Sequence, residues 1–257
     1  MRYNELLGSK PEYKDFLTSC DHARSVSLLT AVDGLLQWDE QTMLPSAAGN
    51  FRAEQVAALA AITHAQRTEK EQGERLQKLR DSSLEKEWPR VVEATIRLLH
   101  ADFQKQSRIP GKLVQELART SIEAQQAWVR AVKASEWKPM VTHLEKMFSL
   151  KRELAACQSP DLDPYDALLD DYEPGARWKS VNATFSRLRK ALAPLVRGCI
   201  ESSEGPRETV LRGNFPLQSQ QAFVRHVIEE IGFSFDRGRL DTTAHPFCST
   251  LGPNDCR

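Results

Sequence analysis

The chain has 257 residues, of which 40% are hydrophobic and 27% are charged, a balance typical of a globular protein with a buried core. Lysine plus arginine and aspartate plus glutamate each number 35, so the net charge is zero and nothing favours binding to nucleic acid or to an anionic membrane surface. No apolar run approaches the roughly 20 residues that a membrane-spanning helix needs, and the first residues lack the apolar segment of a secretory signal.

The cysteines indicate a compartment. They are scattered along the chain without a CxxC pair, at Cys20, Cys157, Cys199, Cys248 and Cys256. An odd number of unclustered cysteines without a signal peptide predicts reduced thiols and a cytoplasmic protein.

Helical periodicity begins near the N-terminus and recurs along most of the chain. One face is apolar from Glu12 to about Leu36, and Pro45 and Gly49 then predict a loop. Asn50 is the expected N-cap of a second helix, with a break near His64. Spacing predicts further helices through Leu76 and Leu79, from Trp88 to Phe103, from Pro110 to Ala131, from Met140 to Leu154, from Trp178 to Leu195, and from Phe223 to Ile231.

These elements predict an all-α fold. Gly232 suits the C′ position that ends the last helix. Short joins favour neighbouring antiparallel helices, and no useful strand alternation or fixed repeat period is present. Because no linker is long enough to separate independent domains, we expect seven to nine helices in a single domain over residues 1–257.

The histidines do not form a local metal site. A helical zinc site commonly uses two histidines four residues apart with a glutamate between them, whereas the closest pair here, His226 and His245, is nineteen apart. We interpret all but His245 as helix-surface or core-edge residues; His245 differs because Asp241, Pro246 and Phe247 accompany it. The sequence also lacks a GxSxG elbow, a recognisable cysteine nucleophile signature and a phosphate-binding glycine loop.

Two acidic features have both a chemical and a structural interpretation. The carboxylates Asp166, Asp170, Asp171 and Glu173 suggest acid–base chemistry or a cation site, but their spacing matches no calcium loop. A solvated loop with carboxylates near the N-terminus of the helix at Trp178 is the favoured interpretation. Trp38-Asp39 is similarly interpreted as a packed anchor beside a hydrogen-bonded carboxylate rather than a catalytic pair.

Arginines near the C-terminal end also leave two alternatives. Arg237, Arg239 and Arg257 each have the planar fork that binds carboxylates. They are equally able to pair with the aspartates at positions 236, 241 and 255, an interpretation favoured for Arg237 and Arg239.

Three ordered segments resemble the carboxypeptidase Taq family of zinc metallocarboxypeptidases. LLQWDEQTMLP at 35–45, followed by RAEQ at 52–55, resembles the family's WDxxTxMP and RxxQ motifs, although Leu44 is inserted between Met and Pro. DALLDDYEPG at 166–175 resembles LLDxYEPG. GRLDTTAHPF at 238–247, running into DCR at 255–257, resembles GRLDxSxHPF and DxRxT.

This resemblance implies a neurolysin-like helical fold in which a deep groove leads to zinc, and a homodimeric enzyme that removes single C-terminal residues from peptide substrates. The family's HExxH zinc helix and later ligands follow DxRxT, and this sequence contains no HExxH. We therefore expect residues 1–257 to be an incomplete, N-terminal half of such a domain, truncated before the zinc helix, with no catalytic or metal-binding residues and no zinc bound alone. The resemblance makes His245, Asp255 and Arg257 candidates for groove or active-site-adjacent positions.

Three functional hypotheses follow. The chain is an inactive portion that needs a separately supplied C-terminal half, a helical binding or regulatory module that retained the groove, or an interaction protein with chance motif matches. The ordered motifs disfavour the third. A half-domain would also expose the apolar surface that missing helices cover, which predicts poor solubility or self-association.

Overall fold

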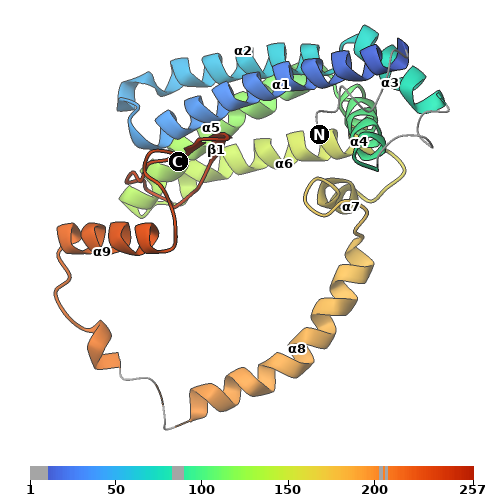
Figure 1. Ribbon diagram of the computed structural model, residues 1–257. Coiled ribbons are helices and arrows are strands. Elements are labelled where there is room, and N and C mark those ends of the chain that lie inside the picture. Colours follow the sequence, from blue (N-terminus) through green and yellow to red (C-terminus); the bar gives the residue numbers. More distant parts are fainter. Residues whose placement is uncertain (1–10, 83–89, 203–204, 206–207) are drawn as a thin grey trace. The chain divides into compact units, whose positions relative to one another are not determined.

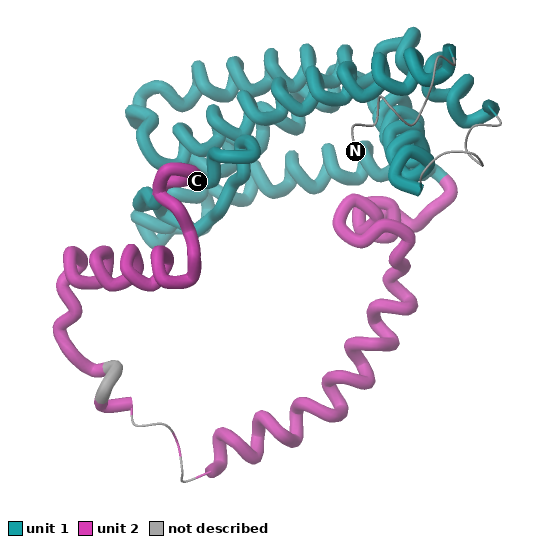
Figure 2. Tube along the Cα trace, in the orientation of Figure 1, with its two compact units in different colours: residues 1–160, 240–257 teal, residues 161–239 magenta. Residues whose placement is uncertain are grey.

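The computed structural model describes residues 11–82, 90–202, 205 and 208–257. Contacts divide the chain into two compact units, one of residues 1–160 with 240–257 and the other of residues 161–239 (Figure 2). Two compact units can belong to one domain, so the single domain over residues 1–257 stays a prediction.

Paired helices build the first unit (Figure 1). Its elements are α1 (Pro11–Thr42), the 3₁₀ turn η2 (Ser46–Ala48), α2 (Gly49–Arg67), α3 (Lys70–Asp81), α4 (Arg90–Gln106), α5 (Gly111–Ala134), α6 (Lys138–Gln158), β1 (Thr250–Gly252) and β2 (Asp255–Cys256). Helix α2 packs against α1 and α5, α5 packs against α6, and α3 packs against α1 and α4. The all-α fold class is therefore confirmed.

The apolar faces of these helices form separate core clusters. Phe16 of α1 meets Leu79 of α3 and Ile96 of α4. Small residues such as Ala53 and Ala127 are buried where α2 and α6 approach α5, and they let helix backbones come close. Burial of apolar surface stabilises a protein by roughly 25 cal/mol per Å². These packing contacts are the main stabilising term for α2, α3, α5 and α6, whose N-caps make no side-chain hydrogen bond.

Helix boundaries differ from the sequence expectation at the first loop. Helix α1 continues past Leu36 to Thr42. Gly34 lies inside it where the hairpin packs, and a Cβ there would lie 2.7 Å from the Leu251 side chain, which is too close unless Leu251 shifts. Glycine inside a helix costs only about 1 kcal/mol, which tertiary packing offsets. Asn50 as the N-cap is wrong, because Ala48 occupies that position and Asn50 lies within the first turn of α2.

Other boundaries follow the sequence more closely. Helix α2 ends at Arg67 rather than near His64. The predicted restart at Trp88-Pro89 lies outside the described residues, but α4 begins at Arg90 as the spacing indicates. Helix α5 follows Pro110, whose missing N–H is tolerated at a helix start.

A small antiparallel hairpin was not predicted. Strand β1 pairs with β2 so that Thr250 opposes Cys256 and Gly252 opposes Asp255, which leaves Pro253 and Asn254 as the turn. The hairpin packs on α1. Two strands of three and two residues are too short to show period-two alternation, so the sequence carries no signal for them.

The second unit contains α7 (Pro164–Leu169), α8 (Trp178–Glu201), the 3₁₀ turn η4 (Glu208–Leu211) and α9 (Leu217–Glu230) (Figure 1). Gly232 follows the C-cap Ile231 with φ +94°, which confirms its predicted C′ position. Across the described residues, none of the helices combines the length and the apolar character that crossing a membrane requires.

Candidate functional site

The hairpin meets the C-terminal end of α1 at a polar cluster of Trp38, Asp241, Asp255 and Arg257, here called the Trp38 cluster. The Trp38 side chain is buried, and its Nε1 donates a hydrogen bond to Oδ2 of Asp241 at 3.2 Å. The Arg257 guanidinium lies over the Trp38 ring, 4.4 Å from its centroid. Its Nε and Nη2 donate to the two carboxylate oxygens of Asp255 at 2.8 and 3.0 Å.

The electrostatics of the Trp38 cluster hold Arg257 in its charged form. The hydrogen bonds that Arg257 donates to Asp255 raise the pKa of Arg257 above its ordinary value, and the charges of Asp255 and Asp241 act in the same direction against partial desolvation. Two of the five guanidinium N–H donors are engaged by Asp255. The arrangement therefore anchors the hairpin on α1 by a cation–π contact and a bidentate ion pair.

A second network lies beneath the same end of α1. Arg52 of α2 is only 8% exposed. It donates from Nη1 to the Leu36 carbonyl at 2.6 Å, from Nη2 to Asp39 Oδ2 at 2.6 Å, and from Nε to Gln55 Oε1 at 3.1 Å. Asp39 is thus the hydrogen-bonded carboxylate beside a packed tryptophan that the sequence indicated.

The role of Arg52 was missed at the sequence level. The motif RAEQ was recognised, but no function was assigned to its arginine. Its i, i+3 spacing puts Arg52 and Gln55 on one helix face, which is the available signal for their contact. The partners on α1, thirteen and sixteen residues earlier, depend on tertiary packing.

Burial perturbs Glu40, the next acid on α1. Desolvation raises the pKa of Glu40, opposed by a hydrogen bond with Gln126 and by the charge of Arg52. Gly49, at the start of α2, lies directly against the Gln126 amide, where a Cβ would overlap it. The glycine therefore lets α5 bring Gln126 to Glu40.

The structure places His245 on a different set of partners. Its ring meets Trp128 edge to face, with centroids 5.8 Å apart. Both line a cavity of about 430 Å³ against α5 and α6, together with Ser121, Ala124, Gln125, Met140 and Met147. The predicted candidates therefore separate: Asp255 and Arg257 contact each other and Trp38, whereas His245 lines an aromatic and methionine-lined hollow.

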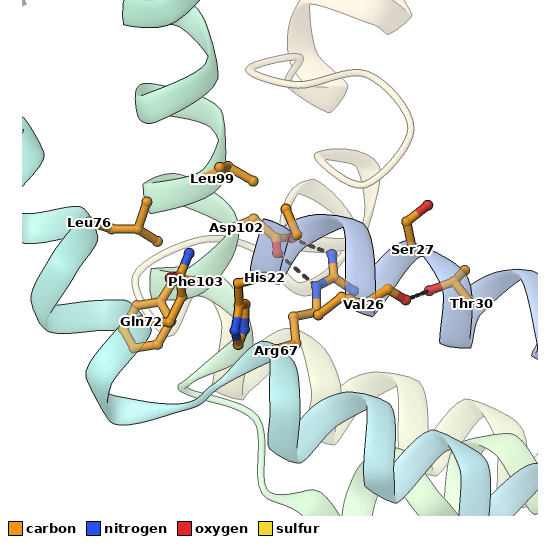
Figure 3. Close-up of a pocket in the computed structure, with 11 residues that line it drawn as sticks. His22, Val26, Ser27, Thr30, Arg67, Gln72, Leu76, Leu99, Asp102 and Phe103 are labelled. Atoms are coloured by element: carbon orange, nitrogen blue, oxygen red, sulfur yellow. Dashed lines mark hydrogen bonds and ion pairs between the residues drawn. The ribbon is translucent and has the colours of Figure 1, made fainter. Parts of the chain in front are cut away.

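Another cavity, of about 330 Å³, lies among α1 to α4 (Figure 3). In Figure 3, Arg67 and Asp102 face each other and form a bidentate ion pair. His22 contacts the Gln66 carbonyl at 2.8 Å and the Glu69 carboxylate at 3.3 Å. Each of these polar groups contacts another group of the protein, so they join the helices around the cavity. This agrees with the core-edge interpretation of His22.

The acidic segment of the second unit performs local capping. Asp166 Oδ1 accepts a hydrogen bond from the backbone N–H of Trp178 at 2.6 Å, at the N-terminus of α8. Asp170 Oδ1 accepts from the Gly175 N–H at 2.9 Å. Gly175 has φ +82°, a conformation that favours glycine in this turn. These contacts agree with a structural acidic loop.

The donor set does not fit a zinc ion. A catalytic zinc site needs three converging protein ligands. Within the ranges that the structure describes, no group of three or more histidine, cysteine, aspartate or glutamate residues is placed to hold a metal ion. In the Trp38 cluster the two aspartates accept hydrogen bonds from Trp38 and Arg257, which is an anchoring arrangement.

Comparison with known proteins establishes the family. The profile of the carboxypeptidase Taq (M32) metallopeptidases matches residues 18–257. This chain belongs to that family. The resemblance seen in the three ordered motifs is thereby confirmed, and chance matches in an unrelated interaction protein are ruled out as their source.

The relatives are about twice as long as this chain. Thermostable carboxypeptidase 1 of Thermus thermophilus is 32% identical over 243 residues, which cover 91% of this chain and 48% of the relative. Carboxypeptidase 1 of Bacillus subtilis is 28% identical over 239 residues, covering 92% and 47%. The chain therefore spans about half the length of the curated relatives it matches.

Solved structures give the same result. The M32 carboxypeptidase from Deinococcus radiodurans R1 aligns with a TM-score of 0.77 and 31% identity, covering 95% of this chain and 48% of that one. The crystal structure of BsuCP aligns with a TM-score of 0.87 and 26% identity, covering 96% and 48%. The helical fold is thus shared with one portion of these proteins.

Proposed function

We propose that residues 1–257 supply the amino-terminal portion of a zinc-dependent carboxypeptidase that removes single residues from the C-termini of peptides. In this proposal the chain provides scaffold and groove wall, and a further portion provides the zinc ligands and the general base. The chain alone is then inactive. When bound in that further portion, zinc would lower the pKa of a water molecule and polarise the scissile carbonyl.

One observation carries the proposal. The family match runs along residues 18–257 and covers about half of each relative, while the printed sequence contains no HExxH. A protein that retains the family's scaffold without its metal motif has the expected properties of one portion of the enzyme.

The Trp38 cluster has a positioning role in this proposal. It fixes the DCR segment, which resembles the family's DxRxT motif, against the end of α1. We assign Asp255 and Arg257 to holding that segment next to a groove, because they form a bidentate ion pair with each other. His245, beside Trp128, forms part of a groove wall.

Helix α8 offers a surface for the further portion. Its apolar residues follow helical spacing and are exposed: Phe185 (60%), Leu188 (47%), Leu192 (43%), Leu195 (61%) and Ile200 (77%). An apolar stripe of this length is typical of a helix that packs against a partner. In this proposal the partner is the second half of the M32 fold, which would cover the apolar residues of α8. Two enzymes completed in this way would then form the homodimer.

The test measures metal and activity before and after complementation. The purified 257-residue chain is assayed for zinc by mass spectrometry and for release of the C-terminal residue from a blocked dipeptide, with and without added zinc. We expect no stoichiometric zinc and no turnover. Adding the second half of the Thermus thermophilus relative, expressed separately, is expected to give zinc-dependent release.

Two controls make this test decisive. A second half whose HExxH glutamate is replaced by glutamine must form the same complex without turnover, which separates assembly from chemistry. The second half by itself must show less activity than the mixture. Stoichiometric zinc and turnover by the 257-residue chain alone would refute the proposal.

A peptide-binding module is the second candidate. The cavity beside His245 favours it, since Trp128, Met140 and Met147 supply the adaptable apolar lining that promiscuous peptide sites use. Fluorescence polarisation with labelled peptides distinguishes the two. Binding by the chain alone that Trp128→Ala abolishes, together with failure of the complementation, would favour the module.

A further inference from the structure

Two cysteines that are eight residues apart in the sequence come together on the hairpin. The sulfur atoms of Cys248 and Cys256 lie 3.6 Å apart. Cys248 is exposed and Cys256 is partly buried. Both are free thiols, and their approach was not predicted from the sequence, because it depends on the hairpin.

The hairpin backbone holds these two residues in register. Ser249 and Arg257, their sequence neighbours, exchange two N–H to carbonyl hydrogen bonds at 2.7 Å each. Thr250 opposes Cys256, so Cys248 lies diagonally across from Cys256 on the same side of the ladder. The thiol pair is therefore built by the ladder and is not a chance approach of two mobile side chains.

We propose that Cys248 and Cys256 form a redox-active dithiol that low-molecular-weight disulfides, such as oxidised glutathione, convert reversibly into an intramolecular disulfide. One protein thiolate attacks oxidised glutathione, forming a mixed disulfide and releasing one glutathione thiolate. The second protein thiolate attacks the protein sulfur of that mixed disulfide and releases the second glutathione. Two protein thiols are oxidised, one glutathione disulfide is reduced, and both protons end on glutathione.

Access and geometry both favour this pair over the remaining cysteines. The exposed Cys248 sulfur can be reached by a small disulfide, and its partner needs to move by only about 1.5 Å to reach the S–S bonding distance of about 2.05 Å. The bond would tie the segment before β1 to β2, where Cys256 lies between Asp255 and Arg257.

The reaction should be faster at higher pH. The hydrogen bond with Cys256 raises the pKa of Cys248 above its ordinary value, so less of the reactive thiolate is present at neutral pH. Raising the pH toward that pKa increases the thiolate fraction and the rate of the first exchange step.

The test compares the folded and unfolded chain in the same redox buffers. The 257-residue protein is equilibrated with reduced and oxidised glutathione, quenched with an alkylating agent and analysed by intact mass and peptide mapping. We expect a species lighter by two hydrogens, cross-linked between Cys248 and Cys256. Its equilibrium constant should be at least about tenfold larger in buffer than in 8 M urea, because the hairpin raises the effective concentration of the two thiols.

Matched variants keep the outcome clear. Cys199→Ala removes an exposed cysteine outside the hairpin and should leave the equilibrium unchanged. Cys248→Ser should yield a glutathione adduct instead of the cross-link. Separate glutathione adducts on the native wild-type protein, a cross-link that survives Cys248→Ser, or equal equilibrium constants in buffer and urea would each overturn the proposal. None of these measurements depends on the proposed carboxypeptidase function.

Discussion

Replacing Arg52 with methionine removes the buried charge that joins α2 to α1. Methionine keeps most of the side-chain length and apolar volume, so the change mainly deletes hydrogen bonds and the ion pair. The Leu36 carbonyl and the Asp39 carboxylate each lose a donor at 2.6 Å. Gln55 loses a weaker one at 3.1 Å.

The expected cost follows from these losses. Breaking a buried ion pair from one side costs about 3–5 kcal/mol, because the other charge stays in place. Asp39 is a third exposed, which lets water screen part of that charge, whereas the Leu36 carbonyl adds about 1–3 kcal/mol if it stays unsatisfied. We therefore expect Arg52→Met to lower the free energy of unfolding by about 2–4 kcal/mol.

Urea denaturation followed by far-UV circular dichroism measures this change. Arg119→Met is the matched control, because Arg119 also forms a bidentate pair, with Glu54 at 3.0 Å, but on the surface. Exposed pairs contribute little, so the control should have a clearly smaller effect. If Arg52→Met shifts stability by no more than Arg119→Met does, the assignment of Arg52 as a buried structural anchor is wrong.

Three further predictions test packing, charge burial and docking. Gly73→Ala places a methyl group against the Phe103 ring, and the overpacking cost of about 1–3 kcal/mol should outweigh a helix-propensity gain of at most about 1 kcal/mol. Gly111→Ala is the control, because its nearest contact is at 3.7 Å and the change should not destabilise. Thermal melts of both variants check this, and a more stable Gly73→Ala would contradict it. Desolvation raises the pKa of Asp33 above its unfolded value, so its charge opposes folding as the pH rises through that pKa. Asp33→Asn should therefore gain stability over wild type at pH 7 and lose this advantage near pH 4, which parallel melts at the two pH values measure; an advantage independent of pH would refute the assignment. Leu192→Asp on α8 should weaken association with a complementing second half in sedimentation or calorimetry while leaving the helical signal intact, and unchanged affinity would remove α8 from the docking surface.

The candidate site was only partly predictable from the sequence. The motifs indicated His245, Asp255 and Arg257 as candidates and Trp38 as a packed anchor, and for Arg257 both ligand binding and pairing with an aspartate stayed open. The hydrogen bond between Trp38 and Asp241 joins residues 203 positions apart. No local pattern specifies such a contact, because it depends on how the hairpin packs on α1.

Short-range physics accounts for what the sequence determined. Apolar spacing of three and four residues predicted α4, α5, α6 and α8, and proline and glycine marked their ends, because these preferences act within one or two helical turns. The ordered motifs also indicated the family, because the identity and order of their residues can be recognised without knowing their contacts.

Only the tertiary structure decided the features that depend on distant packing. Gly34 fits inside α1 because Leu251, more than two hundred residues later, fills the space that a side chain would occupy. Arg52 is buried because α1 covers it, and Cys248 reaches Cys256 because a two-residue turn aligns the strands. In each case the deciding free energy comes from burial or pairing between segments, which local propensities of about 1 kcal/mol or less cannot specify.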